Sequence, residues 1–307
     1  MSPLTPNTTP VLLIIFNRPE KVKQLIEALS VIKPKHIYIA ADGPRSHVPT
    51  DKDRCEETRT IASAIAWECE IHTNFQAVNL GCKRGVSTAI TWFFERVPAG
   101  IILEDDCIPT PSFFSYCTEL LERYRENDQI MHISGSTFID PEIHTDTMNS
   151  YYFSNIPLIW GWASWRRAWN KYDIEMNDIE SLKKYLSDKN IFSSKSFRYF
   201  WITLFRHIKK NNIDTWDGQW VYSILKSDGI CITPSHNLIK NIGFDSDATH
   251  TTEAVSFSRG LGELSFPLTH PNNISIDKKA DDETMKVAFV NTPRKQLKYF
   301  LRSLFNI

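Results

Sequence analysis

The chain has 307 residues, of which 42% are hydrophobic and 12% aromatic, so it is long and apolar enough to bury a sizeable core. Its 35 lysines and arginines balance 36 acidic residues, and this near-neutral charge excludes general nucleic-acid binding. Six scattered cysteines form no CxxC pair, which argues against a zinc ribbon and favours a reducing compartment.

The first part of the chain alternates predicted strands with predicted helices. Apolar runs typical of buried strands lie at 11–16, 36–41 and 101–103, and a further strand is predicted at 70–75. Helical patterns lie at 20–30, 53–67 and 84–96. Because parallel strands need such crossovers, this order predicts an α/β fold with a mostly parallel, Rossmann-like sheet flanked by helices.

The rest of the chain is more mixed. Further helices are predicted at 113–124, 179–186, 194–210 and 219–227, and strands at 129–134 and 230–234. The stretch 150–169 contains four tryptophans, two tyrosines and one phenylalanine, whereas 241–259 is polar with no clear period. We recognise no signal peptide and no membrane span, so we expect a cytoplasmic protein.

Three consecutive acids, Glu104, Asp105 and Asp106, follow the apolar run 101–103. Neighbouring carboxylates at the end of a buried strand repel one another unless a cation or hydrogen-bond donors compensate them. Open α/β sheets bind ligands at this carboxyl edge, and hard oxygen ligands favour Mg²⁺ or Mn²⁺. The alternative is a solvated acidic turn that caps the following helix.

Charged residues also follow the first two predicted strands, with Arg18 after the first and Asp42 after the second. A guanidinium at a sheet edge suits a diphosphate, and an aspartate there can accept a hydrogen bond from a nucleobase N–H. Lys83 and Arg84, just before a predicted helix, suit phosphate as well, although a solvated basic turn explains them nearly as well. The common position of Arg18, Asp42 and the acids on one sheet edge favours a binding site.

Two aromatic segments carry further candidates. Gly161 lies between Trp160 and Trp162, which suggests a backbone that approaches a ligand, and the C–H faces of sugars stack on aromatic rings. Core packing is the alternative for each ring. In the second segment Trp216 directly precedes Asp217, which on its own is typical of a helix cap.

Taken together, these residues resemble the nucleotide-sugar glycosyltransferases of the GT-A fold, and the similarity is greatest to the N-acetylglucosaminyltransferase I-like branch and its bacterial relatives. The run 101–109 with Phe113 and Phe114 resembles their acidic motif, and the other segments follow in matching order over roughly 11–250. The resemblance implies a single GT-A domain at 1–270, with a donor half at 1–135 and an acceptor half at 136–270. A C-terminal tail would cover 271–307.

The resemblance also implies a metal-dependent, inverting transfer from a nucleotide sugar, expected to be UDP-linked, to a hydroxyl of a glycan or lipid-linked glycan. Asp106 would bind Mn²⁺ or Mg²⁺, and Asp217 would be the catalytic base. Glu104 and Asp105 would bind the donor sugar and ribose, and Asp42 would contact the uracil. The other nucleotide-sugar-binding residues would be Arg18, Arg84, Gly161, Trp162 and Trp216. The segment 243–250 resembles a loop that closes over bound donor.

Two other functions fit part of the pattern. A sugar nucleotidyltransferase usually carries a glycine-rich loop after the first strand, whereas 16–19 contains no glycine. A non-catalytic sugar-binding module of the same fold would not need the acids and Asp217 to be intact.

The tail at 294–307 has four basic residues, no acid and one apolar stripe. It would either pack on the domain or place the protein at the anionic inner face of a membrane.

Overall fold

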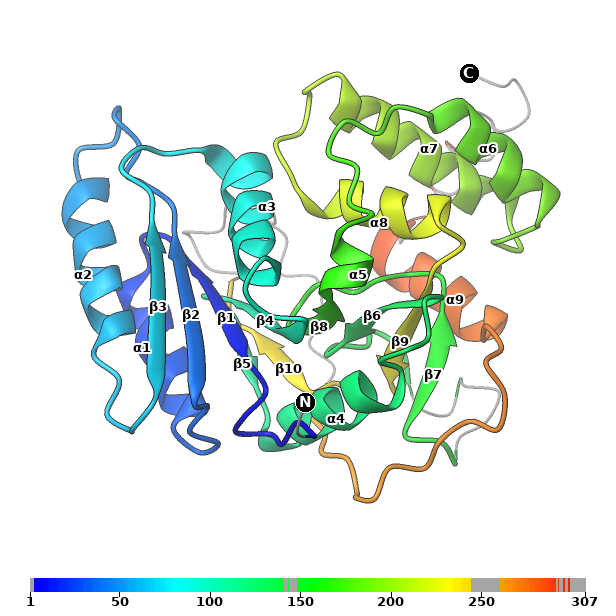
Figure 1. The fold of residues 1–307 in the computed structure, drawn as a ribbon. Coiled ribbons are helices and arrows are strands. Elements are labelled where there is room, and N and C mark those ends of the chain that lie inside the picture. The colour runs from blue at the N-terminus through cyan, green and yellow to red at the C-terminus, as the bar shows by residue number, and fades with distance from the viewer. Residues whose placement is uncertain are drawn as a thin grey trace.

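A computed structural model describes residues 3–140, 143, 148–243, 260–290, 292, 295 and 298. The centre of the fold is an eight-stranded sheet with the strand order β3-β2-β1-β4-β8-β6-β9-β7 (Figure 1). The strands are β1 Val11–Ile15, β2 His36–Ala41, β3 Glu70–Phe75, β4 Ala99–Glu104, β6 Ile130–Ser134, β7 Tyr151–Ser154, β8 Trp162–Trp165 and β9 Ile230–Pro234.

The sheet is mostly parallel, with two antiparallel strands, β8 inside the sheet and β7 at its edge. β1 pairs in parallel with β2 and β4, β2 with β3, and β6 with β9. β8 runs antiparallel to both β4 and β6, and β7 runs antiparallel to β9. The predicted fold class, a mostly parallel α/β sheet flanked by helices, is confirmed.

Helices cover both faces of the sheet. The longer ones are α1 Pro19–Leu29, α2 Asp51–Ser63, α3 Gly81–Phe94, α4 Pro111–Arg123, α6 Ile179–Asp188, α7 Lys195–Lys209 and α8 Asp217–Lys226. The shorter ones are α5 Arg166–Trp169, α9 Lys278–Thr284 and the π-helix η2 Met285–Phe289. Proline at the first position of α1 and α4 suits a helix start, because that position has no intrahelical N–H partner to lose.

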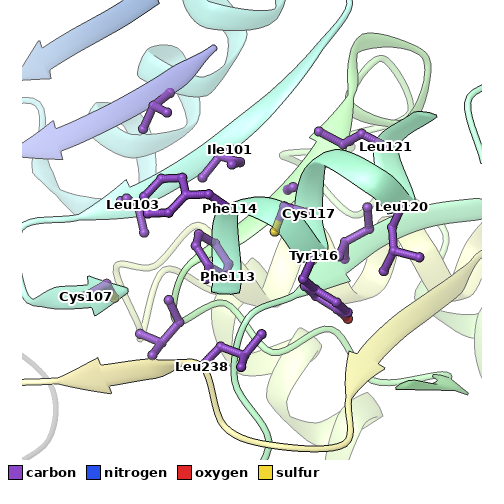
Figure 2. Packing of buried hydrophobic residues seen from close by; sticks show 14 of the residues in the cluster. Ile101, Leu103, Cys107, Phe113, Phe114, Tyr116, Cys117, Leu120, Leu121 and Leu238 are labelled. Carbon is purple, nitrogen blue, oxygen red and sulfur yellow. The ribbon is translucent and has the colours of Figure 1, made fainter. Parts of the chain in front are cut away.

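Alternate strand residues divide between two hydrophobic cores, as expected for buried strands. Leu13 of β1 and Leu103 of β4 belong to the core under α1 and α4. Figure 2 shows Phe113 and Phe114 of α4 gathered beside Leu103. Leu12 and Ile102 face the other way, toward α3 and the tryptophans of α5 and α8. A third core holds α6, α7 and part of α8 together.

A small second sheet lies beside the end of β4. β5 (Cys107–Pro109) pairs antiparallel with β10 (Ile239–Asn241), and the N–H of Ile242 donates to the carbonyl oxygen of Asp106 at 2.8 Å. This pairing brings residues far apart in the chain next to the acidic run.

Some boundaries differ from the sequence-based expectations. The helix expected at 84–96 begins at Gly81, and the one expected at 53–67 ends at Ser63. The tryptophan-rich run forms β8, a strand that the sequence did not predict. The loop expected at 243–250, apart from Gly243, and the tail helix at 294–307, apart from Lys295 and Lys298, lie outside the described residues. No helix in the described part of the chain is long and apolar enough to cross a membrane.

Candidate active site

A cavity of about 840 Å³ lies at the carboxyl ends of β1, β2 and β4. This is the edge where open α/β sheets bind ligands, and the volume suits a ligand of several hundred daltons. Seven of the predicted site residues line it, namely Arg18, Asp42, Glu104, Asp105, Asp106, Trp216 and Asp217. The fold therefore brings together residues from four separate segments of the sequence.

One guanidinium pairs with two of the three adjacent acids. Nη1 of Arg18 donates to Oδ1 of Asp105 at 3.0 Å and to Oδ2 of Asp106 at 3.1 Å. Asp105 also accepts a hydrogen bond from the N–H of Phe16 at 3.3 Å. Since Arg18 follows β1 and the acids follow β4, the parallel pairing of these strands creates the contact.

Negative charge still exceeds positive charge at this edge. Burial, together with the charges of Asp106, Asp105 and Asp217, raises the pKa of Glu104 to about 8. Burial also raises the pKa of Asp105 to about 6, although Arg18 opposes that rise. A second cation would stabilise this arrangement, because the ionised forms of buried acids need compensation.

The acids fit a divalent metal that is shared with a phosphate ligand. Among the described residues, no group of three histidine, cysteine or acidic side chains is arranged to hold a metal by itself. Mg²⁺ and its analogues commonly take only one or two carboxylates from the protein and complete their shell with water and substrate phosphates. Asp106 offers hard oxygen ligands on the cavity wall and meets that requirement.

Asp42 organises the turn that precedes α3. Its two carboxylate oxygens accept hydrogen bonds from the N–H groups of Gly43, Leu80 and Gly81 and from the side chain of Asn79, at 2.8 to 3.1 Å. A carboxylate has about four lone-pair sites, so these donors fill it. A nucleobase N–H that approached Asp42 would have to replace one of them.

A second acid beside Asp42 was not recognised from the sequence. Asp51, at the start of α2, is buried and accepts hydrogen bonds from the guanidinium of Arg45 at 2.6 and 2.9 Å and from the Asn17 side chain at 2.7 Å. These hydrogen bonds, of which those from Arg45 have the largest effect, lower the pKa of Asp51 to about 2. All three residues line the cavity, and the guanidinium of Arg45 lies 5.3 Å from the centre of the Phe16 ring. In the sequence, the only sign of this cluster is that Asn17 and Arg45 lie shortly after the ends of predicted strands.

Asp217 opens α8 and projects into the cavity wall. Its Oδ1 accepts hydrogen bonds from the hydroxyl of Thr215 and from the N–H of Gly218, the latter at 2.8 Å. Within the described part of the chain, its Oδ2 accepts no hydrogen bond. One oxygen is thus held in place while the other is available to a ligand, which suits a proton acceptor.

The tryptophans divide between cavity and core. Trp160 lines the cavity and is half-buried, and Trp216 also borders the cavity but is almost completely buried. Trp162 is fully buried and stacks under Trp216 with ring centres 5.7 Å apart. Trp162 therefore supports the cavity wall from behind and does not line it. Gly161 has φ +58°, and a Cβ there would lie 2.4 Å from the Ile239 side chain. The close approach at Gly161 is to the chain's own β10.

Arg84 also lies apart from the cavity lining. It is exposed on α3, which begins three residues earlier than expected. The first N–H groups of that helix already have carboxylate partners, Asp42 for Gly81 and Asp214 for Cys82 and Lys83. The structure thus does not bring Arg84 together with the other predicted site residues.

Comparison with known proteins returns structural likeness alone. No family model matches the chain, and no curated protein matches it. Among solved structures, the mannosyltransferase PcManGT from Pyrobaculum calidifontis, in complex with GDP-Man and Mn²⁺, is similar over 72% of this chain and 69% of its own, with 9% identity and a TM-score of 0.38. A UDP-glucose pyrophosphorylase complexed with UDP-glucose is similar over 49% of this chain and 64% of its own, with 10% identity and a TM-score of 0.28. Likeness at this level carries no argument about the reaction.

Proposed function

We propose that this protein is a metal-dependent glycosyltransferase that moves a sugar from a nucleotide sugar to an acceptor hydroxyl with inversion. The observation that carries the proposal is the convergence of Arg18, Glu104 to Asp106 and Asp217 on one cavity at the carboxyl edge of the sheet. A cavity of about 840 Å³ accommodates a ligand of nucleotide-sugar size.

The donor would lie along this edge. Arg18 would meet the nucleotide or its phosphates, and Glu104 and Asp105 would hydrogen-bond the donor sugar and ribose. Asp106 would hold Mn²⁺ or Mg²⁺ together with those phosphates. When bound there, the metal would stabilise the negative charge that develops on the diphosphate leaving group.

The protein's own base would be Asp217. Its Oδ1 is held by Thr215 and Gly218, and its Oδ2 would accept the proton of an acceptor hydroxyl as the hydroxyl oxygen attacks the anomeric carbon. One base is enough for inversion, because the nucleotide leaving group needs no general acid of the kind that glycosidases use. Trp216 and Trp162, which are both buried and stack on each other, would support the cavity wall beside the transferred sugar.

The nucleobase would lie at the end of the cavity formed by Asp42, Asn17, Arg45 and Asp51. We propose a UDP-linked donor as the first to test. Because the Asp42 oxygens already accept four N–H donors, we assign Asp42 mainly to ordering this end of the cavity.

A donor-turnover assay tests the proposal. Purified protein is incubated with a panel of UDP- and GDP-linked sugars, with Mn²⁺ or with a chelator, and nucleoside diphosphate release is measured. We expect slow, metal-dependent hydrolysis of one donor, lost in Asp106→Ala and kept in Asp178→Ala, which removes a helix-capping acid outside the cavity lining. Metal-dependent pyrophosphate release from a nucleoside triphosphate and a sugar 1-phosphate would instead identify a nucleotidyltransferase. Donor binding without any turnover would identify a sugar-binding module.

The acceptor we propose is a glycan or a lipid-linked glycan, reached from the face that carries Trp160 and Asp217. The basic, apolar-striped segment 294–307 would bring the protein to an anionic membrane surface where a lipid-linked acceptor resides. Co-sedimentation with anionic and neutral vesicles tests this part, using the full chain and a version that ends at residue 291. Equal sedimentation of the two folded proteins would contradict it.

A further inference from the structure

The first turn of α3 is held by two carboxylates from distant parts of the chain. Four consecutive N–H groups, those of residues 80 to 83, would lack intrahelical partners at a helix start. Asp42 accepts from Leu80 and Gly81, and Asp214 accepts from Cys82 at 2.9 Å and from Lys83 at 3.1 Å. Each oxygen of Asp214 takes one N–H, and the positive end of the helix dipole favours a carboxylate there.

Asp214 lies in the segment that leads to the proposed base. This segment connects α7 to α8, and Asp214, Thr215, Trp216 and Asp217 all line the cavity. Thr215 donates its hydroxyl hydrogen to Oδ1 of Asp217. A short chain of contacts therefore runs from the donor side of the cavity, through Asp214, to the carboxylate of Asp217.

The geometry of Gly81 shows how closely the two segments fit. Gly81 has φ +78°, and a Cβ there would lie 2.7 Å from Oδ2 of Asp214. Any side chain at this position would both strain the backbone and press against the carboxylate. The contact between α3 and the segment before α8 therefore depends on both Gly81 and Asp214.

We propose that Asp214 is a positioning residue of the transfer reaction. By capping α3 it fixes the segment that carries Asp217 against the donor side of the cavity, and it does not itself bind the donor. The inference rests on the proposed function, since it assigns Asp217 as the base. Its physical basis is that small misplacements of a reacting group cost about 10²-fold in rate even when the change is outside the chemistry.

The first test is Asp214→Ala, assayed for donor affinity by calorimetry and for turnover with the donor that the wild-type protein uses. We expect turnover to fall at least about 10-fold while the donor dissociation constant stays within about 3-fold. Hydrogen exchange at the amides of Cys82 and Lys83 should accelerate. Asp178→Ala is the matched control, because it removes the capping acid of α6, which accepts from the N–H of Ser181 at 3.2 Å outside the cavity lining.

A double-variant cycle separates positioning from general destabilisation. If Asp214 acts through Asp217, then Asp214→Ala should change turnover less than about 2-fold in an Asp217→Asn background. Should Asp214→Ala fold poorly, Gly81→Ala and Asp214→Asn disturb the same contact and carry the same expectation.

Several results would overturn the inference. One is a turnover of Asp214→Ala equal to that of Asp178→Ala, and another is an undiminished effect in the Asp217→Asn background. A loss of donor affinity that matches the loss of turnover would show that Asp214 binds the donor itself. Absence of any donor turnover by the wild-type protein would refute the proposed function, a result distinct from these.

Discussion

Replacing Asp281 with asparagine should remove a defined part of the pH dependence of stability. Asp281, on α9, is buried and accepts hydrogen bonds from the hydroxyl of Ser154 at 2.6 Å and from two N–H groups of Asn155 at 2.8 and 3.1 Å. All of these donors are neutral, so burial dominates and raises the pKa of Asp281 from 3.8 to about 6.

The sign of the effect follows from proton binding. The unfolded chain releases the Asp281 proton near pH 3.8, whereas the native protein retains it up to about pH 6. The stability that Asp281 contributes is therefore fully present below its unfolded-state pKa of 3.8 and is lost as pH rises through its native pKa of about 6. The gap corresponds to about 3 kcal/mol, of which about 2 to 3 kcal/mol falls between pH 4 and pH 7.

Asparagine can keep the local contacts without titrating. Its carbonyl oxygen can accept both N–H groups of Asn155, and its amide can donate to the Ser154 hydroxyl oxygen, which already accepts from the N–H of Ile156 at 2.9 Å. The variant should therefore fold, and its stability should lack the contribution that Asp281 loses as pH rises.

The assay is urea unfolding followed by tryptophan fluorescence at several pH values from 4 to 7. We expect the free energy of unfolding of the wild-type protein to fall by about 2 to 3 kcal/mol relative to Asp281→Asn across this range. Asp188→Asn, an exposed position at the end of α6, should follow the wild-type curve. Parallel curves for wild-type and Asp281→Asn proteins would refute the reasoning.

Three further predictions concern the cavity. Asp106→Ala should abolish the Mn²⁺ dependence of UDP binding in calorimetry while circular dichroism shows an intact fold; unchanged metal dependence would contradict the ligand assignment. Asp217→Asn should lower transfer about 10²–10⁴-fold and leave the donor dissociation constant unchanged, and a much smaller loss would reduce Asp217 to a helix cap. Gly243→Ala would place a Cβ 2.3 Å from Oδ2 of Asp106, whereas nothing lies within 4 Å of a Cβ at Gly260. Metal-dependent donor binding should therefore weaken at least about 10-fold in Gly243→Ala and stay unchanged in Gly260→Ala. Equal donor binding by the two variants would contradict the expected clash with Asp106.

Local patterns in the sequence predicted much of the sheet. The bounds of β2, β3 and β9 agree with the strands predicted from the sequence, because turn residues flank each strand and set its length. The alternation of strands and helices then placed Arg18, Asp42 and the acids on one edge, since parallel strands end on the same side.

The tryptophan-rich run shows where local pattern failed. A dense aromatic stretch has no period that separates a strand from a ligand-binding loop. In the structure this run forms β8, and the strands that pair with β8, namely β4 and β6, lie far from it in the chain. The close neighbour of Gly161 is Ile239, a contact that only the tertiary fold creates.

The roles of Asp214 and Asp42 as capping acids could also not be predicted from the sequence. Asp214 caps a helix more than 130 residues away, as the separations of 132 and 131 from Cys82 and Lys83 show. The partners of the Asp42 carboxylate likewise lie 37 to 39 residues ahead of it, apart from the adjacent Gly43. An aspartate in a turn looks the same in sequence whether it caps its own helix or a distant one.

Two buried acidic sites in this protein show why a raised pKa alone does not identify a functional site. Burial raises the pKa of Asp281 to about 6 and that of Glu104 to about 8. Asp281, however, has three neutral donors and lies outside the cavity lining, so its environment is complete without a ligand. Glu104 lines a cavity of about 840 Å³ beside Asp105 and Asp106, the two acids that pair with the guanidinium of Arg18. The acids at the end of β4 thus combine excess negative charge with a cavity at one place, an arrangement that the proposed metal and bound diphosphate would complete.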